Sequence, residues 1–288
     1  MTFMLYTISD LVLDVQGGSD ELSERMAGYA LSPLQRGGRS CDIKILVEKK
    51  KKIALPAGEP MGRSGIWKLM RTEVGYTVYR ILPGFDDMVS VRMDFQSNEA
   101  TLSLLSLDDD NRDRRDFIFA GQAFSNLILT KDRIVLHGSC IAYRGKAIIF
   151  SAPSGTGKST HTGLWAENLK DVIYINDDTP VVDVSHADGA VFACGSPWSG
   201  KNQKNTNVIV PLCAVVFLER GTENEICPIG KTEAMARLLG EVRKLPLRCF
   251  VERAAENCGK LICRVPVYRL RCNISYDAVE TVRRELSL

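Results

Sequence analysis

The chain has 288 residues, 45% of them hydrophobic and 25% charged, which is ordinary for a globular protein and enough for one large or two modest domains. A net charge of +2 argues against nucleic acid as the main ligand, because nucleic-acid binding usually requires a strongly basic face. The nine cysteines are odd in number and contain no C-x-x-C pair. We therefore expect buried thiols in a reducing compartment instead of a disulfide framework or a zinc site.

The start of the chain and its apolar runs predict a protein that is neither secreted nor embedded in a membrane. The N-terminus lacks the basic start and the long apolar stretch of a signal peptide. No run approaches the ~18 apolar residues that a membrane-spanning helix needs. We therefore expect a cytoplasmic protein with neither a membrane nor a nucleic acid as its partner.

The first third of the chain has the pattern of half-buried strands. Short stretches such as Cys41–Val47 and Val89–Phe95 alternate polar with apolar residues, which is the period of a strand with one buried face. The charged run 108–116 is typical of a solvated loop that leads into a helix, and residues 117–129 have helical spacing. We predict an antiparallel, β-rich N-terminal region over residues 1–115 and a second domain over 116–288.

The second region alternates strand and helix patterns. Arg144-Gly145 lies between two apolar runs and predicts a tight β-hairpin. Further strands are expected at Ile134–Leu136, Val172–Ile175, Val208–Val210 and Ala214–Leu218, and helices at Thr232–Glu241 and Ala278–Leu286. The pattern predicts an α/β domain.

The segment from Ala152 to Ser159 fits the Walker A phosphate-binding pattern, with Ala152 in place of the first glycine. Glycines at 155 and 157 let successive backbone N–H groups turn inward, and the next helix adds its N-terminus, which together form a cavity for anionic oxygens. Lys158 adds a positive charge toward the β- and γ-phosphates, and the Ser159 hydroxyl can ligate Mg²⁺. An apolar strand precedes the segment and a helix pattern follows it. The sequence therefore predicts an ATP and Mg²⁺ site whose cofactor-binding residues are Ser154, Gly155, Thr156, Gly157, Lys158, Ser159 and Thr160.

Two adjacent carboxylates, Asp177 and Asp178, follow the predicted strand Val172–Ile175. If that strand runs parallel to the one before the phosphate loop, its carboxyl end lies beside the loop. One carboxylate can then hold Mg²⁺ and the other can accept the proton of an attacking hydroxyl. Neighbouring residues of a strand point in opposite directions, so a turn at Thr179-Pro180 is needed for both to reach the site.

The order Leu136-His137-Gly138, phosphate loop, Asp177-Asp178 resembles the catalytic core of HPr kinase/phosphorylase, a family similar to the nucleotide-binding domain of phosphoenolpyruvate carboxykinases. The resemblance covers roughly residues 130–240. It implies a P-loop-containing α/β domain of the phosphoenolpyruvate carboxykinase/HPr kinase type behind the β-rich region, and it makes a homo-oligomer plausible.

The resemblance also implies roles for single residues. Asp177 would be the general base, assisted by His137 near the transferred phosphoryl group, and Asp178 the main metal ligand with Ser159, although these two aspartates could exchange roles. Two positions depart from the family pattern: Thr160 stands where a glutamate is usual, and Asn176 precedes the aspartates where an alanine is usual. These departures leave HPr itself in doubt as the substrate.

The polar stretch 195–207 is a candidate loop for the phosphoryl acceptor. It contains Lys201, Lys204 and several amide side chains, with Trp198 as one wall of a pocket. Such a loop could grip a polyhydroxyl compound, and Lys201 could neutralise phosphate charge during transfer. An ordinary solvated loop is an equally good interpretation of the same residues.

Together these patterns predict a kinase that transfers the γ-phosphoryl group of ATP to a hydroxyl of a small molecule, either a polyol such as inositol or free serine. Two alternatives stay open: a protein or peptide serine kinase of the HPr kinase type, and a nucleotide-binding regulatory module without transfer activity. An assay of ADP release with candidate acceptors separates the three.

Overall fold

The computed structural model describes residues 5–32, 38–64, 67–81, 88–105 and 115–288. The chain divides into two compact units, Met1–Thr130 and Lys131–Leu288. The domain boundary expected after residue 115 stays a prediction. The helix over Arg115–Leu127 belongs to the first of the two compact units. Residues 1–4 and most of the charged run 108–116 lie outside the described residues.

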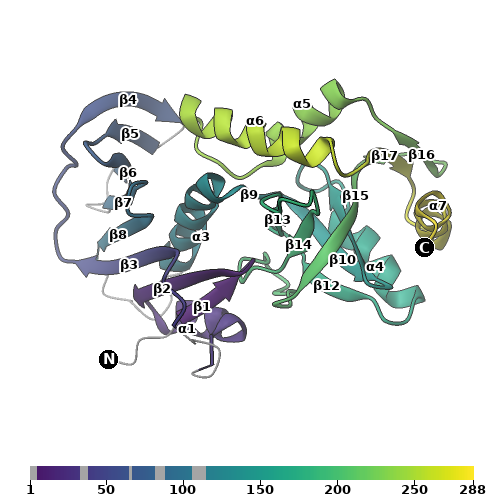
Figure 1. The fold of residues 1–288 in the computed structure, drawn as a ribbon, viewed down its shortest axis with the longest axis horizontal. Coiled ribbons are helices and arrows are strands. Elements are labelled where there is room, and N and C mark those ends of the chain that lie inside the picture. The colour runs from purple at the N-terminus through teal and green to yellow at the C-terminus, as the bar shows by residue number, and fades with distance from the viewer. Residues whose placement is uncertain (1–4, 33–37, 65–66, 82–87, 106–114) are drawn as a thin grey trace. The chain divides into compact units, whose positions relative to one another are not determined.

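The first unit contains an eight-stranded sheet in the order β1-β2-β3-β8-β7-β6-β5-β4 (Figure 1). The strands are β1 Leu5–Ile8, β2 Leu11–Gly17, β3 Ile43–Lys50, β4 Glu59–Ser64, β5 Trp67–Arg71, β6 Gly75–Ile81, β7 Met88–Asp94 and β8 Glu99–Leu105. The helices are α1 Asp20–Met26 and α3 Arg115–Leu127, and α3 packs against β3, β7 and β8.

The expectation of a β-rich N-terminal region is confirmed, but the sheet is not wholly antiparallel. Strand β3 pairs in parallel with both β2 and β8. Parallel neighbours need a crossover connection, which helix α1 supplies between β2 and β3 and the strands β4 to β7 supply between β3 and β8. Turn signals in the sequence could indicate strands but not these distant pairings.

The second unit contains a nine-stranded sheet whose main path is β12-β10-β11-β15-β14-β13-β9, with β17 beside β15 and β16 beside β17 (Figure 1). The strands are β9 Arg133–Val135, β10 Gly138–Tyr143, β11 Lys146–Ser151, β12 Ile173–Asn176, β13 Val181–Asp183, β14 Phe192–Cys194, β15 Ile209–Arg220, β16 Glu225–Pro228 and β17 Val267–Cys272. The helices are α4 Lys158–Asn168, α5 Lys231–Glu241, α6 Arg248–Ile262 and α7 Tyr276–Leu286. The mixed α/β class is confirmed.

The predicted hairpin is present as β10 and β11. Its two turn residues, Arg144 and Gly145, have φ angles of 49° and 74°, as a two-residue turn between twisted strands requires. The expectation of two separate strands at 208–210 and 214–218 is wrong, because both belong to β15. Pro211 suggested a break in the strand, but it lies within β15 and opposes Phe192 of the short strand β14. Beyond Pro211 the strand continues between β11 and β17.

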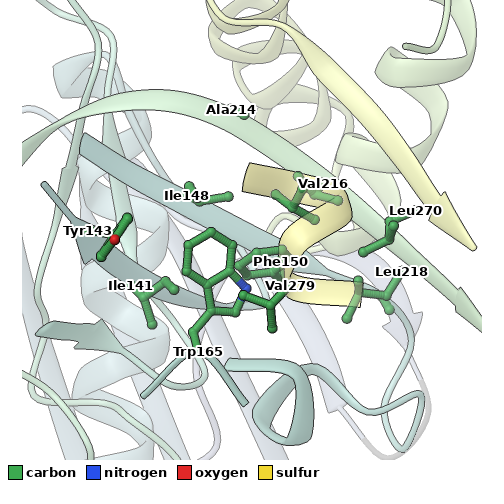
Figure 2. Packing of buried hydrophobic residues seen from close by; sticks show 12 residues of the cluster. Ile141, Tyr143, Ile148, Phe150, Trp165, Ala214, Val216, Leu218, Leu270 and Val279 are labelled. Carbon is green, nitrogen blue, oxygen red and sulfur yellow. The ribbon is translucent and has the colours of Figure 1, made fainter. Parts of the chain in front are cut away.

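Helices α4 and α7 pack against each other at the hydrophobic core of the second unit. Trp165 of α4 is fully buried beside Phe150 of β11 and Val279 of α7 (Figure 2). The Trp165 and Phe150 rings lie 6.0 Å apart, centre to centre. This packing fixes α4, and with it the loop at its N-terminus, to the sheet. In the part of the chain that the structure describes, no helix combines the length and the apolar character needed to cross a bilayer.

Candidate functional site

Three strand ends meet at one edge of the second sheet. Strands β11 and β12 both run antiparallel to β10, which lies between them, so β11 and β12 point in the same direction. Gly138, at the start of β10, opposes Ser151 at the end of β11, and Cys140 opposes Asn176 at the end of β12. The phosphate loop, His137 and the paired aspartates therefore emerge at the same edge, as expected, although an antiparallel strand separates the two parallel ones.

The phosphate loop has the strand, turn and helix that its sequence predicts. Gly155 and Gly157 have φ angles of +80° and +119°, where a side chain would be strained, and the space around both is open. Gly157 precedes α4 and supplies no side-chain cap. The first hydrogen bond inside the helix runs from His161 N to Gly157 O, so the N–H groups before it point out of the helix end. The arrangement suits an anion.

Lys158 is the buried charge of the loop. Its Nζ donates to the carbonyls of Ala152, at 2.8 Å, and Pro153, at 3.4 Å, and its side chain is mostly buried. Burial lowers the pKa of Lys158, and the negative charges of Glu241 and Asp178 oppose that shift. The ammonium group is thus held at the loop within electrostatic reach of two carboxylates. Ser154, Ser159 and Thr160 are exposed, whereas Thr156 is half-buried.

The two aspartates point to different surroundings. Asp177 is buried, and its Oδ1 accepts a 2.6 Å hydrogen bond from the Ser139 hydroxyl. Ser139 Oγ also lies 2.8 Å from the hydroxyl of Thr162 on α4. Asp177 is thereby connected to the first turns of the helix that carries Ser159. Asp178 is more exposed, and its Oδ1 lies 3.7 Å from His137 Nε2. The expectation that His137 assists Asp177 differs from this geometry, in which His137 neighbours Asp178.

The side chain of Asn176 forms the turn that allows the adjacent carboxylates of Asp177 and Asp178 to lie at the same edge of the sheet. Its Oδ1 accepts from the N–H groups of Asp178, at 2.9 Å, and Thr179, at 2.6 Å, which closes the chain into a tight turn. Its Nδ2 donates to Ser196 O at 2.7 Å. An alanine at position 176 could make none of these bonds. The turn expected at Thr179-Pro180 therefore begins three residues earlier, at Asn176, the residue that departs from the family pattern.

Two charged residues of the site, Glu241 and Arg243, were not singled out from the sequence. Glu241 Oε2 lies 2.7 Å from His137 Nδ1, and an Arg243 guanidinium nitrogen lies 4.0 Å from Asp178 Oδ1. Glu241 is the last residue of helix α5, and the chain becomes extended at Val242. The three residues Glu241, Val242 and Arg243 alternate charged, apolar and charged. This alternation is the signal in the sequence for an extended segment with one buried face. The segment with which it pairs lies about a hundred residues earlier in the chain, so the pairing could not be predicted from it.

The polar stretch 195–207 lies beside the aspartates. A Cβ added to Gly200 would meet Asp178 Cβ at 3.2 Å, and Asn202 Nδ2 lies 3.4 Å from Asp177 Oδ2. Lys201 is exposed at this place. Lys204 instead covers the ring of Tyr174, with Nζ 4.4 Å from the ring centre. The loop thus presents the Asn202 amide beside the paired carboxylates, with Lys201 next to it in the chain, whereas the Lys204 ammonium lies over Tyr174.

Among the described residues, no three His, Cys, Asp or Glu side chains are grouped closely enough to hold a metal ion by themselves. The hard oxygen ligands of the site are the Ser159 hydroxyl and the two aspartates. They are of the type that Mg²⁺ prefers, and Mg²⁺ in nucleotide sites usually takes its remaining ligands from phosphate oxygens and water. The donor set therefore fits Mg²⁺ bound together with a nucleotide.

A family model described as SynChlorMet cassette protein ScmC matches residues 125–287. No curated protein matches the sequence. Among solved structures, the chain is similar to the Hpr(Ser) kinase/phosphatase from Coxiella burnetii, with 9% identity over 52% of this chain and 95% of that one. The TM-score of that match is 0.30, and a likeness at this level carries no argument about fold or function.

Proposed function

The chain belongs to the family of SynChlorMet cassette protein ScmC, and for this member we propose an ATP- and Mg²⁺-dependent kinase that phosphorylates a hydroxyl of a small molecule, a polyol such as inositol or free serine. One observation carries the proposal. The phosphate loop, two carboxylates in different surroundings and a histidine occupy a single edge of one sheet. Phosphoryl transfer needs these three components: a cradle for the phosphates, a metal ligand and a base.

The loop amides at 154–157, the N-terminus of α4 and Lys158 would hold the phosphates of ATP. Ser159 and one aspartate would hold Mg²⁺, which supplies neutralisation of phosphate charge when bound. Asp177 suits the metal because the hydrogen bonds through Ser139 and Thr162 connect it to the helix that carries Ser159. This assignment reverses the one that the family resemblance implied first, and it leaves Asp178 as the base.

Asp178 is the more exposed of the two carboxylates and borders the candidate acceptor loop at Gly200. It neighbours His137, Arg243 and Gly200, and Lys201 follows directly in the loop. In the proposed reaction Asp178 takes the proton of the acceptor hydroxyl as that oxygen bonds to the γ-phosphorus, and the bond from the γ-phosphorus to the oxygen bridging it to the β-phosphate breaks to release ADP. Arg243, beside Asp178, and Lys201 would stabilise charge on the phosphoryl group in transfer.

The decisive experiment measures ADP release from ATP and Mg²⁺ with a panel of polyols, amino acids and hydroxyl-bearing peptides. We expect stimulation by a polyol or by serine. Stimulation by peptides alone would favour the protein kinase alternative. Nucleotide binding without turnover on any acceptor would favour the regulatory module and contradict the kinase proposal.

In the same assay, Lys158→Ala should lower kcat by on the order of 10²–10³, the loss typical of one donor to the transition state. Lys170→Ala is the matched control, because Lys170 is exposed beyond the far end of α4. Near-normal turnover of Lys158→Ala would contradict the assignment of the phosphate loop.

A further inference from the structure

A short extended segment after helix α5 pairs with the chain just before β10. Leu136 and Val242 form an isolated antiparallel bridge. His137 N donates to Glu241 O, and Arg243 N donates to Val135 O, each at 2.9 Å. Glu241, the last residue of α5, contacts His137, and Arg243 lies beside Asp178, while Val242 between them is buried. The bridge therefore brings two charges of the C-terminal third to His137 and Asp178.

Glu241 contacts His137 twice, through its carbonyl to the backbone N–H and through its carboxylate to the ring. The Oε2 to Nδ1 distance is 2.7 Å, and only 14% of the His137 side chain and 17% of the Glu241 side chain are exposed. An ionised carboxylate can only accept hydrogen bonds, so Nδ1 must be the donor. The other ring nitrogen, Nε2, is then the one directed at Asp178, 3.7 Å away.

We propose that Glu241 is the positioning residue of the site: it holds His137 with a proton on Nδ1 and with Nε2 presented to Asp178. Its catalytic consequence rests on the proposed kinase function. When Asp178 has taken the proton of the acceptor hydroxyl, Nε2 offers a lone pair to which the new carboxyl can donate a hydrogen bond. A ring turned over, or protonated on Nε2 alone, would lose this acceptor.

The surrounding charges support this role for Glu241. Arg243 lies beside Asp178, and Lys158 is within electrostatic reach of Glu241, Asp178 and Asp177. Among these groups, Glu241 gives the largest electrostatic support to the protonated form of Lys158. Glu241 thus lies near the charge of the phosphate loop, and its direct side-chain contact is with His137.

A merely structural role, fastening α5 to the sheet, predicts a different set of results. In that case the free energy of unfolding would depend on Glu241, and the tautomer of the His137 ring would not. The backbone hydrogen bonds of the bridge persist when the side chain is shortened, so a substitution at 241 separates the two roles.

The test compares Glu241→Ala with Glu241→Gln in the full chain. With the acceptor identified in the ADP-release assay, Ala should lower kcat about 10- to 100-fold, as loss of a partner that orients a functional histidine typically does, with little change in KM for ATP. Gln should recover most of the activity, because its amide oxygen still accepts from Nδ1. Glu233→Ala is the matched control, since Glu233 lies on the same helix and pairs with Arg237. Unchanged kcat in Glu241→Ala, or equal losses of kcat and melting temperature in both variants, would overturn the proposal.

A second measurement does not depend on activity. The chain has three histidines, so ¹⁵N-histidine labelling gives three ring systems that are resolved by NMR at one fixed pH. We expect His137 protonated on Nδ1 alone in the wild type and a mixture of tautomers in Glu241→Ala, with His161 and His186 unchanged as references. A wild-type ring protonated on Nε2 would overturn the positioning role. The expected spectra from a chain that phosphorylates no acceptor would instead contradict the kinase proposal and leave the positioning role intact.

Discussion

At the scale of single residues, the paired aspartates are distinguished by what surrounds them. Asp177 is buried and receives the hydroxyl of Ser139, whereas Asp178 is partly exposed beside a histidine and an arginine. A carboxylate bonded into a buried network keeps its orientation, which suits a metal ligand. A carboxylate at the open side can meet a hydroxyl substrate. These different surroundings support the proposed division of roles between two residues that the sequence leaves interchangeable.

Substitution by asparagine should separate these roles. Asp178→Asn should lower kcat by about 10²–10⁴, the usual contribution of a general base, without changing the Mg²⁺ concentration needed for half-maximal rate. Asp177→Asn should raise that Mg²⁺ requirement by at least the ~10-fold that loss of a metal's outer partner already causes. Titrations of rate against Mg²⁺ for both variants check this. The opposite pattern would restore the first assignment, with Asp177 as the base.

At the scale of elements, the stretch 195–207 is held to the site by Asn176 and by close contact at Gly200. Nδ2 of Asn176 reaches Ser196, and Asn205 Nδ2 donates to Ser199 Oγ at 2.6 Å. These hydrogen bonds favour a loop with a defined conformation beside the site over an ordinary solvated connection. Its approach to Asp178 requires a residue without a side chain at position 200.

Gly200→Ala tests this contact with a matched control in Gly145→Ala. The two glycines have φ angles of +70° and +74°, so alanine should cost each variant a similar stability, about 1–2 kcal/mol. Gly145 lies in the β10–β11 turn with open space around it, while the added methyl at 200 would press on Asp178. We expect the melting temperature of Gly200→Ala to fall at least as far as that of Gly145→Ala, and kcat/KM for the acceptor to fall only in Gly200→Ala. Equal activities would show that the loop does not border the acceptor site.

The parts of the fold and site that could be predicted from the sequence are local. The Gly155 and Gly157 positions, the Arg144-Gly145 turn and helix α5 each depend on a few consecutive residues. Glu241 and Arg243 could not be found in this way, because a bridge to residues about a hundred positions away brings them to His137 and Asp178. The parallel pairing of β3 with β2 and β8 could not be predicted for the same reason, because it joins segments that are distant in the sequence. Helix α6 also went unassigned, although its buried side chains follow one face.

At the scale of the whole molecule, one buried histidine links folding to pH. His161 of α4 is 4% exposed, its Nε2 accepts from Trp165 Nε1 at 3.2 Å, and its ring packs on Phe150. Burial lowers the pKa of His161 from 6.5 to about 4. The unfolded chain therefore takes up a proton below pH 6.5 that the folded chain refuses until about pH 4.

The free energy of unfolding should accordingly fall as the pH falls from 6.5 toward 4, by about 3 kcal/mol from this residue. Denaturant unfolding across that range, compared with His161→Phe, isolates the effect, because other groups titrate alike in both proteins. The variant should be less stable at neutral pH, since Trp165 loses its acceptor, but should lose less on acidification. Parallel curves for the two proteins would contradict a neutral buried His161.

The bridge between residues 135–137 and 241–243 has a consequence for the order in which the chain is made. Synthesis runs from the N-terminus, so the segment 146–168 leaves the ribosome well before Glu241 does. During that interval strand β11 at first lacks its neighbour β15, and helix α4 lacks helix α7, against which it packs. A chain that ends before residue 241 therefore lacks both the α7 packing that fixes the phosphate loop and the contact that Glu241 makes with His137. The phosphate loop of the middle third is completed only by elements of the last third.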